Sequence, residues 1–236
     1  MEVVSNVLNK FGFTRSLENS SGVKIVLGVP GCGKTSCIRE IIQTDSRFIA
    51  FTFGVPDNKN VSGAYIRKAP LGDFELPSGA IVLVDEFQAG DWKALKPSFL
   101  FGDICQFDSD FLEVPRSHWY KTVTHRVNKD ICVLLNKLGF QIESTVVGKL
   151  SIEGIYQGEP EGVIIAYCAK VQQLLRDHNL DFLDIENCRG RTFKSATLIL
   201  EDHLILPGDR GKFYLCATRA SSDLKILVPD AIEPTS

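Results

Sequence analysis

Short apolar runs alternate along this chain with amphipathic stretches. The continuous apolar runs predict buried strands. In chain order they cover residues 23–27, 48–53, 80–84, 98–101, 163–167, 196–200, 213–216 and 224–228. Stretches with apolar residues three and four positions apart predict helices. These cover residues 2–11, 33–43, 91–96, 128–138 and 171–177.

Strands that alternate with helices indicate an α/β fold with parallel sheets. The alternation begins again near residue 122, so we expect two α/β units in tandem. Within the first unit, between the strands predicted at 48–53 and 80–84, residues 54–79 are rich in Gly, Pro, Asp and Asn and predict a long irregular connection. Loops of this length on a rigid scaffold are often functional.

Composition excludes several classes of protein. The 26 Lys and Arg against 29 Asp and Glu give a net charge of −3, so nucleic acid can be bound only by a local basic patch. The seven cysteines are scattered without a C-x-x-C pair, which argues against a disulfide scaffold or a zinc site. No apolar run approaches the ~20 residues of a membrane span, and the first residues lack the pattern of a signal peptide, so we expect no transmembrane segment.

The strongest chemical signal is a glycine-rich segment between a predicted strand and a predicted helix. Residues 28–35 read GVPGCGKT and match the phosphate-loop pattern G-x-x-x-x-G-K-[ST] at every fixed position. Glycines let backbone N–H groups turn toward phosphate oxygens, and the helix that follows adds the positive end of its dipole. Lys34 is expected to reach the β- and γ-phosphates and Thr35 to bind Mg²⁺. The expected nucleotide-binding residues are Gly28, Gly31, Gly33, Lys34, Thr35, Ser36 and Asp85.

Asp85 enters that set because it ends an apolar strand, in the segment VLVDE at 82–86. A buried carboxylate costs free energy unless it has a partner, and the Mg²⁺ on Thr35 supplies one. Glu86 is then expected to activate the attacking water as general base. The two elements together predict ATP or another NTP with Mg²⁺, and favour hydrolysis over phosphoryl transfer to a metabolite.

Further motifs follow in a defined order. They are GDICQ at 102–106, THR at 124–126, GRTF at 190–193 and YLCATRA at 214–220. With the phosphate loop and the Asp-Glu pair, this order resembles superfamily 1 nucleic-acid helicases. The resemblance implies that Gln106 senses the γ-phosphate and that Arg126 and Arg219 reach the nucleotide as arginine fingers. A guanidinium suits this role because it stabilises charge on the transferred phosphoryl group.

The close spacing of the motifs leaves no room for the domains that larger helicases insert. A minimal two-lobe helicase of this size resembles the first protein of the triple gene block of plant positive-strand RNA viruses, as in potexviruses and carlaviruses. The resemblance implies two RecA-like lobes, with an N-terminal segment at 1–22, a first lobe at 23–120 and a second lobe at 121–236. It also implies an RNA-binding NTPase and RNA helicase of the host cytoplasm that supports cell-to-cell movement of the viral genome and suppresses RNA silencing.

Two segments combine basic and aromatic side chains, a pattern that binds single strands through phosphate contacts and stacking. The first is the 54–79 loop, from which we select Arg67 and Lys68. The second lies near the junction of the two units, from which we select Trp119 and Lys121. We expect single-stranded RNA, including viral genomic RNA, to bind at these residues.

Two other interpretations stay open. In the first, the chain is an RNA- and partner-binding protein in which ATP only sets the conformation and unwinding is not essential. In this interpretation as in the helicase one, the expected partners include viral coat protein, other movement proteins and further copies of the chain itself. In the second, the chain is a cellular P-loop kinase. A kinase would need a substrate lid, and it does not account for the GDICQ and ATRA segments.

Overall fold

The computed structural model describes residues 2–16, 22–70, 72, 74–103 and 116–229. The chain divides into two compact units, with the boundary between Thr122 and Val123. Within the described ranges, no helix combines the length and apolar character needed to cross a membrane.

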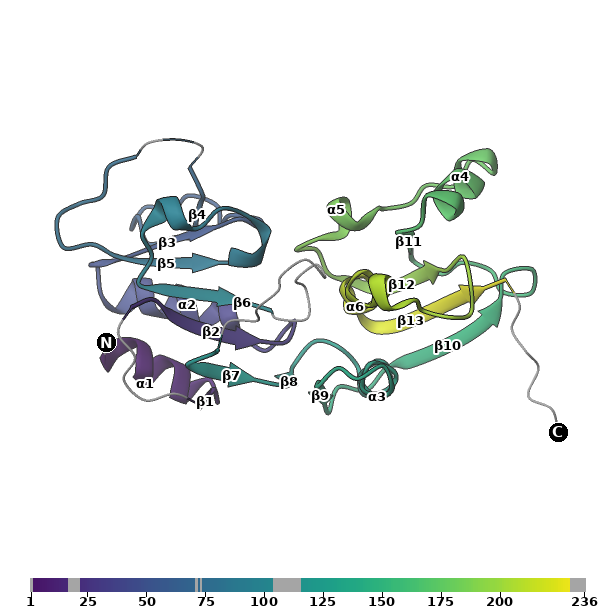
Figure 1. The fold of residues 1–236 in the computed structure, drawn as a ribbon, viewed down its shortest axis with the longest axis horizontal. Helices are drawn as coiled ribbons and strands as arrows, with labels where there is room; N and C mark the ends of the chain where they lie inside the picture. The colour runs from purple at the N-terminus through teal and green to yellow at the C-terminus, as the bar shows by residue number, and fades with distance from the viewer. Residues whose placement is uncertain (1, 17–21, 71, 73, 104–115, 230–236) are drawn as a thin grey trace. The chain divides into compact units, whose positions relative to one another are not determined.

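A sheet with the strand order β1-β7-β2-β6-β5-β3-β4 forms the centre of the first unit (Figure 1). Its neighbouring strands are parallel except for β1 and β7. The strands are β1 Thr14–Arg15, β2 Lys24–Gly28, β3 Phe48–Thr52, β4 Arg67–Lys68, β5 Ile81–Asp85, β6 Phe99–Gly102 and β7 Trp119–Lys121. The helices are α1 Glu2–Lys10 and α2 Lys34–Thr44, with 3-10 turns η1 Phe87–Ala89 and η2 Lys93–Leu95.

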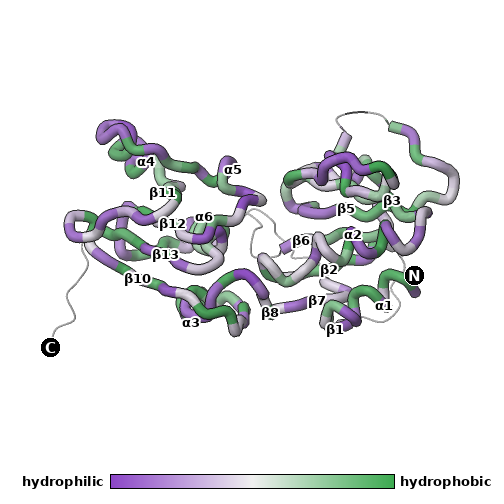
Figure 2. The backbone as a smooth tube through the Cα atoms, turned by 180° about the vertical axis from the view of Figure 1, so that it is seen from behind, coloured by the Kyte–Doolittle hydropathy of each residue, from purple (hydrophilic) through white to green (hydrophobic). Residues whose placement is uncertain are grey.

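The central strands of this unit are buried on both faces, as their continuous apolar sequences predict. Leu83, Val84 and Phe101 are fully buried. Helix α1 is amphipathic and buries Val4, Val7 and Leu8. Figure 2 shows apolar and polar residues alternating along α1. The strands and the two long helices predicted for this part of the chain are therefore confirmed.

The second unit contains a parallel sheet with the strand order β10-β13-β12-β11. Its strands are β10 Lys149–Gly154, β11 Val163–Ile165, β12 Phe193–Ile199 and β13 Ala220–Val228, and a separate pair is formed by β8 Val123–Thr124 and β9 Glu143–Ser144. Its helices are α3 Lys129–Lys137, α4 Ala169–Asp177, α5 Ile185–Cys188 and α6 Arg210–Ala217, with a 3-10 turn η4 Pro207–Asp209. Both units thus have the predicted α/β architecture with mainly parallel strands.

One predicted strand is wrong. Residues 213–216 belong to helix α6, in which Phe213, Tyr214, Leu215 and Cys216 are all buried. A helix that is apolar on every side gives the same short apolar run as a buried strand, so periodicity does not separate the two. The pattern also failed to predict β10, whose sequence KLSIEG mixes charged and apolar residues.

Candidate nucleotide-binding site

The segment 28–35 connects β2 to α2 and forms a tight loop. Gly31 has φ 75° and Gly33 has φ 104°, left-handed conformations that residues with a side chain rarely adopt. A Cβ at Gly33 would also lie 3.2 Å from the ring of Phe11. Since Gly33 is the N-cap of α2, no capping side chain covers the first N–H groups of the helix. Uncapped N–H groups at a helix N-terminus are suited to bind an anion.

Lys34 is buried at the start of α2, and its ammonium group is held by the loop itself. Nζ donates to the carbonyl oxygens of Gly28 at 2.6 Å and Val29 at 3.1 Å. Burial acts to lower the pKa of Lys34, but the neighbouring Cys32 and next Asp103 outweigh burial and raise that pKa above its ordinary value. The side chain is therefore a buried cation inside the phosphate loop.

The side chains of Thr35 and Asp85 meet although they are far apart in sequence. The Thr35 hydroxyl donates to Asp85 Oδ2 at 2.8 Å. Burial, and next the neighbouring charge of Glu86, raise the pKa of Asp85 to about 7. A divalent cation beside this carboxylate would favour its charged form. A hydroxyl and a carboxylate at this separation fit the oxygen ligands that Mg²⁺ prefers.

Glu86 follows β5 in a left-handed conformation with φ 53°. Such a conformation costs of order 1–3 kcal/mol in a residue other than glycine and persists only where surrounding contacts hold it. Here Gln88 Nε2 donates to Glu86 Oε2 at 2.5 Å, and the Glu86 N–H donates to Asp85 Oδ1 at 3.1 Å. A Cβ at Gly102 would lie 2.6 Å from Gln88 Oε1 and from the Phe87 ring, so the first residue of the GDICQ segment must be small for β6 to pack against this turn.

The structure describes only the first part of the GDICQ segment. Asp103 is fully buried and is one of the acidic groups that act on Lys34. Gln106, predicted to sense the γ-phosphate, lies outside the described residues.

Both predicted arginine fingers of the second unit contact the GRTF segment. Arg126 Nη1 donates to Thr192 Oγ1 at 3.0 Å, and Arg219 Nη1 donates to the carbonyl oxygen of Arg191 at 3.3 Å. Arg219 is only 3% exposed, and its Nε donates to the carbonyl oxygen of Leu215 at 2.9 Å. The fold therefore brings three predicted motifs together, with the Arg219 guanidinium bound inside its own unit.

The two predicted RNA contacts in the 54–79 loop are exposed and lie on β4. The Arg67 guanidinium lies 5.5 Å from the centre of the Tyr65 ring. Lys68 Nζ donates to the carbonyl oxygens of Phe53 at 3.1 Å and Gly54 at 3.0 Å. Arg67 thus presents an exposed charge beside the Tyr65 ring, while Lys68 anchors the backbone that follows β3.

Trp119 and Lys121 do not have the surroundings expected of RNA contacts. Trp119 is 2% exposed within β7, so its ring offers no face on which a base can stack, and this prediction is corrected. Lys121 Nζ donates to the carbonyl oxygens of Phe11 at 2.8 Å and Cys32 at 3.0 Å, which joins the end of α1 to the phosphate loop. Sequence analysis missed this structural role because the three residues are distant along the chain.

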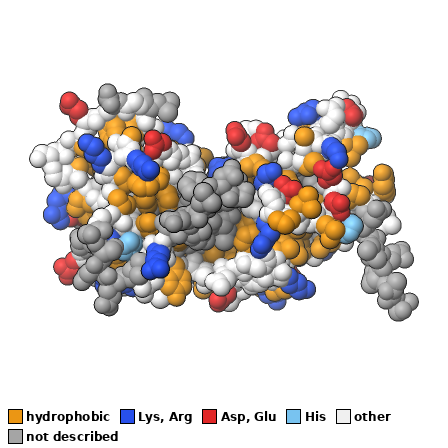
Figure 3. All heavy atoms as spheres, viewed as in Figure 1, with side chains coloured by type: hydrophobic (Ala, Val, Ile, Leu, Met, Phe, Trp, Pro, Cys, Tyr) orange, Lys and Arg blue, Asp and Glu red, His pale blue; other side chains and the backbone are white. Residues whose placement is uncertain are grey.

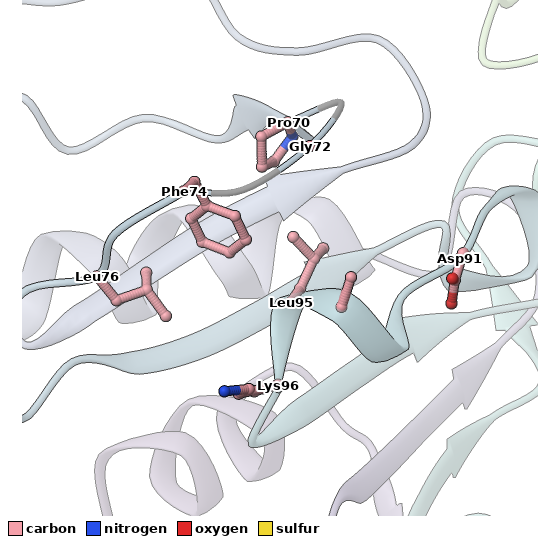
Figure 4. A pocket seen from close by; sticks show the side chains of 8 residues that line it. Pro70, Gly72, Phe74, Leu76, Asp91, Leu95 and Lys96 are labelled. Atoms are coloured by element: carbon pink, nitrogen blue, oxygen red, sulfur yellow. The ribbon is translucent and has the colours of Figure 1, made fainter.

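A separate pocket of about 480 Å³ lies in the first unit between segment 70–76 and η2 (Figure 4). Phe74, Leu76 and Leu95 supply its apolar wall, and Asp91 and Lys96 carry charge on its lining. None of the phosphate-loop residues lines it, so it is not the candidate nucleotide site.

Comparison with known proteins places the site in context. Residues 24–228 match the model of the viral superfamily 1 RNA helicase core domain. The chain is 34% identical to the movement and silencing protein TGBp1 of Poplar mosaic virus and 38% identical to that of Chrysanthemum virus B. Each alignment covers 98% of this chain and 98% of the relative.

Solved structures with a similar fold include an arterivirus helicase, nonstructural protein 10, in complex with DNA. The TM-score is 0.54 at 22% sequence identity over 97% of this chain. The chain spans 57% of the length of that helicase. At this level of identity the similarity establishes the helicase-core fold, in agreement with the predicted RecA-like architecture.

Proposed function

The chain belongs to the viral superfamily 1 RNA helicases and, among them, to the movement and silencing proteins called TGBp1, and from that premise we propose that it is an RNA-binding, ATP-hydrolysing protein of a plant virus. In this role it supports cell-to-cell movement of the viral genome and suppresses RNA silencing. We place it in the host cytoplasm, with ATP or another NTP as substrate.

The observation that carries the proposal is the contact between the phosphate loop and the end of β5. The buried Lys34 cation and the Thr35–Asp85 hydrogen bond lie at the uncapped N-terminus of α2. Thr35 and Asp85 would hold Mg²⁺, which supplies charge neutralisation at the phosphates. The combination fits a bound nucleoside triphosphate better than a structural ion pair, because no side chain caps the first N–H groups of α2.

Each residue has a distinct task in the proposed hydrolysis. Lys34 exchanges its carbonyl partners for phosphate oxygens and neutralises charge that develops in the transition state. Glu86 accepts a proton from the attacking water. Gln106 senses the γ-phosphate, and Arg126 and Arg219 act from the second unit. Arg219 can do so only after its guanidinium leaves the carbonyl oxygens of Arg191 and Leu215.

ATP hydrolysis by the purified chain, with and without single-stranded RNA, tests the proposal. Lys34→Ala is expected to lower turnover about 100-fold or more, since a preorganised positive charge at the phosphates is lost. Lys93→Ala, which removes an exposed lysine of η2, is the matched control and should leave turnover unchanged. Hydrolysis by Lys34→Ala at the wild-type rate would refute the assignment of the site.

A second function is supported by the internal contacts of Arg219. Because this side chain is bound within its own unit, ATP can act mainly by setting the conformation of an RNA- and partner-binding protein. Glu86→Gln separates the two functions, since it keeps the nucleotide site but removes the base. If Glu86→Gln lacks hydrolysis yet retains viral movement and silencing suppression in plants, the motor function is rejected in favour of the binding function.

A further inference from the structure

One edge of the second unit's sheet has no neighbouring strand within the described part of the chain. The order β10-β13-β12-β11 leaves β10 on the outside. Figure 1 shows β10 beside β13 along that edge. Backbone groups that an edge strand turns away from its sheet can pair with a strand of another chain.

Two contacts establish which backbone groups of β10 point outward. The N–H of Lys149 donates to Asp223 Oδ1 at 3.2 Å, and the N–H of Ile155, just beyond β10, donates to the carbonyl oxygen of Val228 at 2.8 Å. Both therefore point toward β13. Because the direction alternates along a strand, Leu150 and Ile152 direct their N–H and C=O groups away from β13.

These two residues also leave apolar surface at the edge. Leu150 and Ile152 are in register with Leu224 and Ile226 of β13 and share their face of the sheet. Leu224 and Ile226 are 1% and 2% exposed, whereas Ile152 is 53% exposed. The buried apolar layer of the unit is therefore uncovered at Ile152, while Leu150 is half-buried.

The charges on β10 are arranged in the order that pairing with an identical strand requires. Antiparallel pairing centred on Ser151 places Lys149 of each copy opposite Glu153 of the other. It also places Leu150 opposite Ile152, and these are the residues whose outward groups can form the hydrogen-bonded pairs. A lysine on an edge strand normally opposes pairing, but here each lysine meets a carboxylate.

We propose that two copies of this chain associate by antiparallel pairing of their β10 strands. The pairing joins two parallel sheets into one continuous sheet with a twofold axis at Ser151. Val147 and Tyr156, which are 77% and 94% exposed, flank the paired segment and add the apolar contact that a short strand alone does not supply. None of the residues assigned to nucleotide binding takes part, so this inference does not depend on the proposed function.

Sedimentation velocity of the full-length chain over roughly 1–100 µM tests the proposal, because the wild type should shift from monomer to dimer in this range. Ile152→Pro should raise the dimer dissociation constant about tenfold or more, since it deletes an outward N–H that the internal ladder does not use. Lys137→Glu, on the exposed end of α3, is the control for a charge reversal in the same unit and should dimerise normally.

A charge exchange tests the register. Lys149→Glu and Glu153→Lys each set like charges opposite each other and should be monomeric alone, with unchanged circular dichroism. Mixed together they restore two complementary pairs and should form a heterodimer. If Glu153→Lys fails to fold because Lys225 loses an ion-pair partner, Lys149→Glu and Ile152→Pro still decide the outcome. A monomeric wild type, a dimer insensitive to Ile152→Pro, or no heterodimer from folded variants would each overturn the proposal.

Discussion

The hydrogen-bond partners of three lysines determine whether each can bind an anion. Lys34, Lys68 and Lys121 are all candidate anion-binding residues by sequence, and all three donate to backbone carbonyl oxygens in the structure. Lys34 lies at the start of a helix whose N–H groups are uncapped, so an anion can replace its carbonyl partners. Lys121 instead bridges two segments of backbone and has a structural task.

Replacing Lys121 by Met tests this structural task. The free energy of unfolding should fall by about 1–3 kcal/mol, because two carbonyl oxygens lose their donor. RNA affinity at each salt concentration should stay as in the wild type. Urea unfolding and RNA titration measure the two effects, and Lys129→Met, at an exposed position on α3, is the control. If Lys121→Met leaves stability unchanged and weakens RNA binding, Lys121 contacts RNA and the structural role is wrong.

Trp119 makes an equally clear prediction at the residue scale. Trp119→Ala should lower the free energy of unfolding by about 3–5 kcal/mol, because it removes a large buried side chain. Tyr120→Ala, at the next position and 42% exposed, should cost far less. Thermal unfolding compares the two variants. Equal, small losses of stability would show that Trp119 is not buried as the structure places it.

At the scale of elements, a side-chain cap marks the residue at which helix α3 begins. Asn128 is the N-cap of α3, and its Oδ1 accepts from the N–H groups of Asp130 and Ile131 at 2.9 Å. Its Nδ2 donates to the carbonyl oxygen of Ser222, the residue before Asp223 on β13. One fully buried side chain therefore both starts a helix and fastens it to the sheet.

The two roles of Asn128 can be separated by substitution. Asn128→Ala loses cap and tether and should cost about 2–4 kcal/mol, the sum of a lost cap and an unsatisfied buried carbonyl. Asn128→Asp keeps an accepting oxygen but sets a carboxylate against the Ser222 carbonyl, so it should also destabilise the chain. Chemical unfolding of both variants measures this. If Asn128→Asp is as stable as the wild type, the tether contributes nothing.

At the scale of the whole molecule, charge is mixed rather than segregated. Lys and Arg lie among Asp and Glu over the face shown in Figure 3, in keeping with the net charge of −3. With a net charge of −3, the protein as a whole does not attract RNA electrostatically. RNA affinity must therefore come from a few local phosphate contacts. A patch of three to five Lys and Arg gives a slope of log K against log salt of about −2 to −4 for single strands.

Arg67→Ala tests the contribution of the 54–79 loop to that slope. If Arg67 contacts one phosphate, the slope should become shallower by about 0.7. ATP hydrolysis without RNA should not change, since Arg67 is outside the nucleotide motifs. RNA titrations at several salt concentrations give the slope, with Lys96→Ala as an exposed control. An unchanged slope and affinity would exclude Arg67 from the RNA path.

Local sequence was sufficient for features that depend on neighbouring residues. The glycines of segment 28–35 and the apolar strands β2 and β5 predicted the phosphate loop and its frame, because backbone conformation and burial pattern leave a local signature. The order of the motifs predicted the helicase-core fold, which the comparisons confirm.

Tertiary structure alone decided the features that depend on distant residues. The burial of Trp119, the bridge from Lys121 to Phe11 and the contacts of Arg219 join segments that no periodicity links. The apolar run at 213–216 is helical in the structure, and a short apolar run alone does not distinguish a buried helix from a buried strand. The same holds for β10. Whether a strand is central or outermost depends on which strands pair with it, and β10 pairs only with β13 among the described strands, so it forms an edge of the sheet.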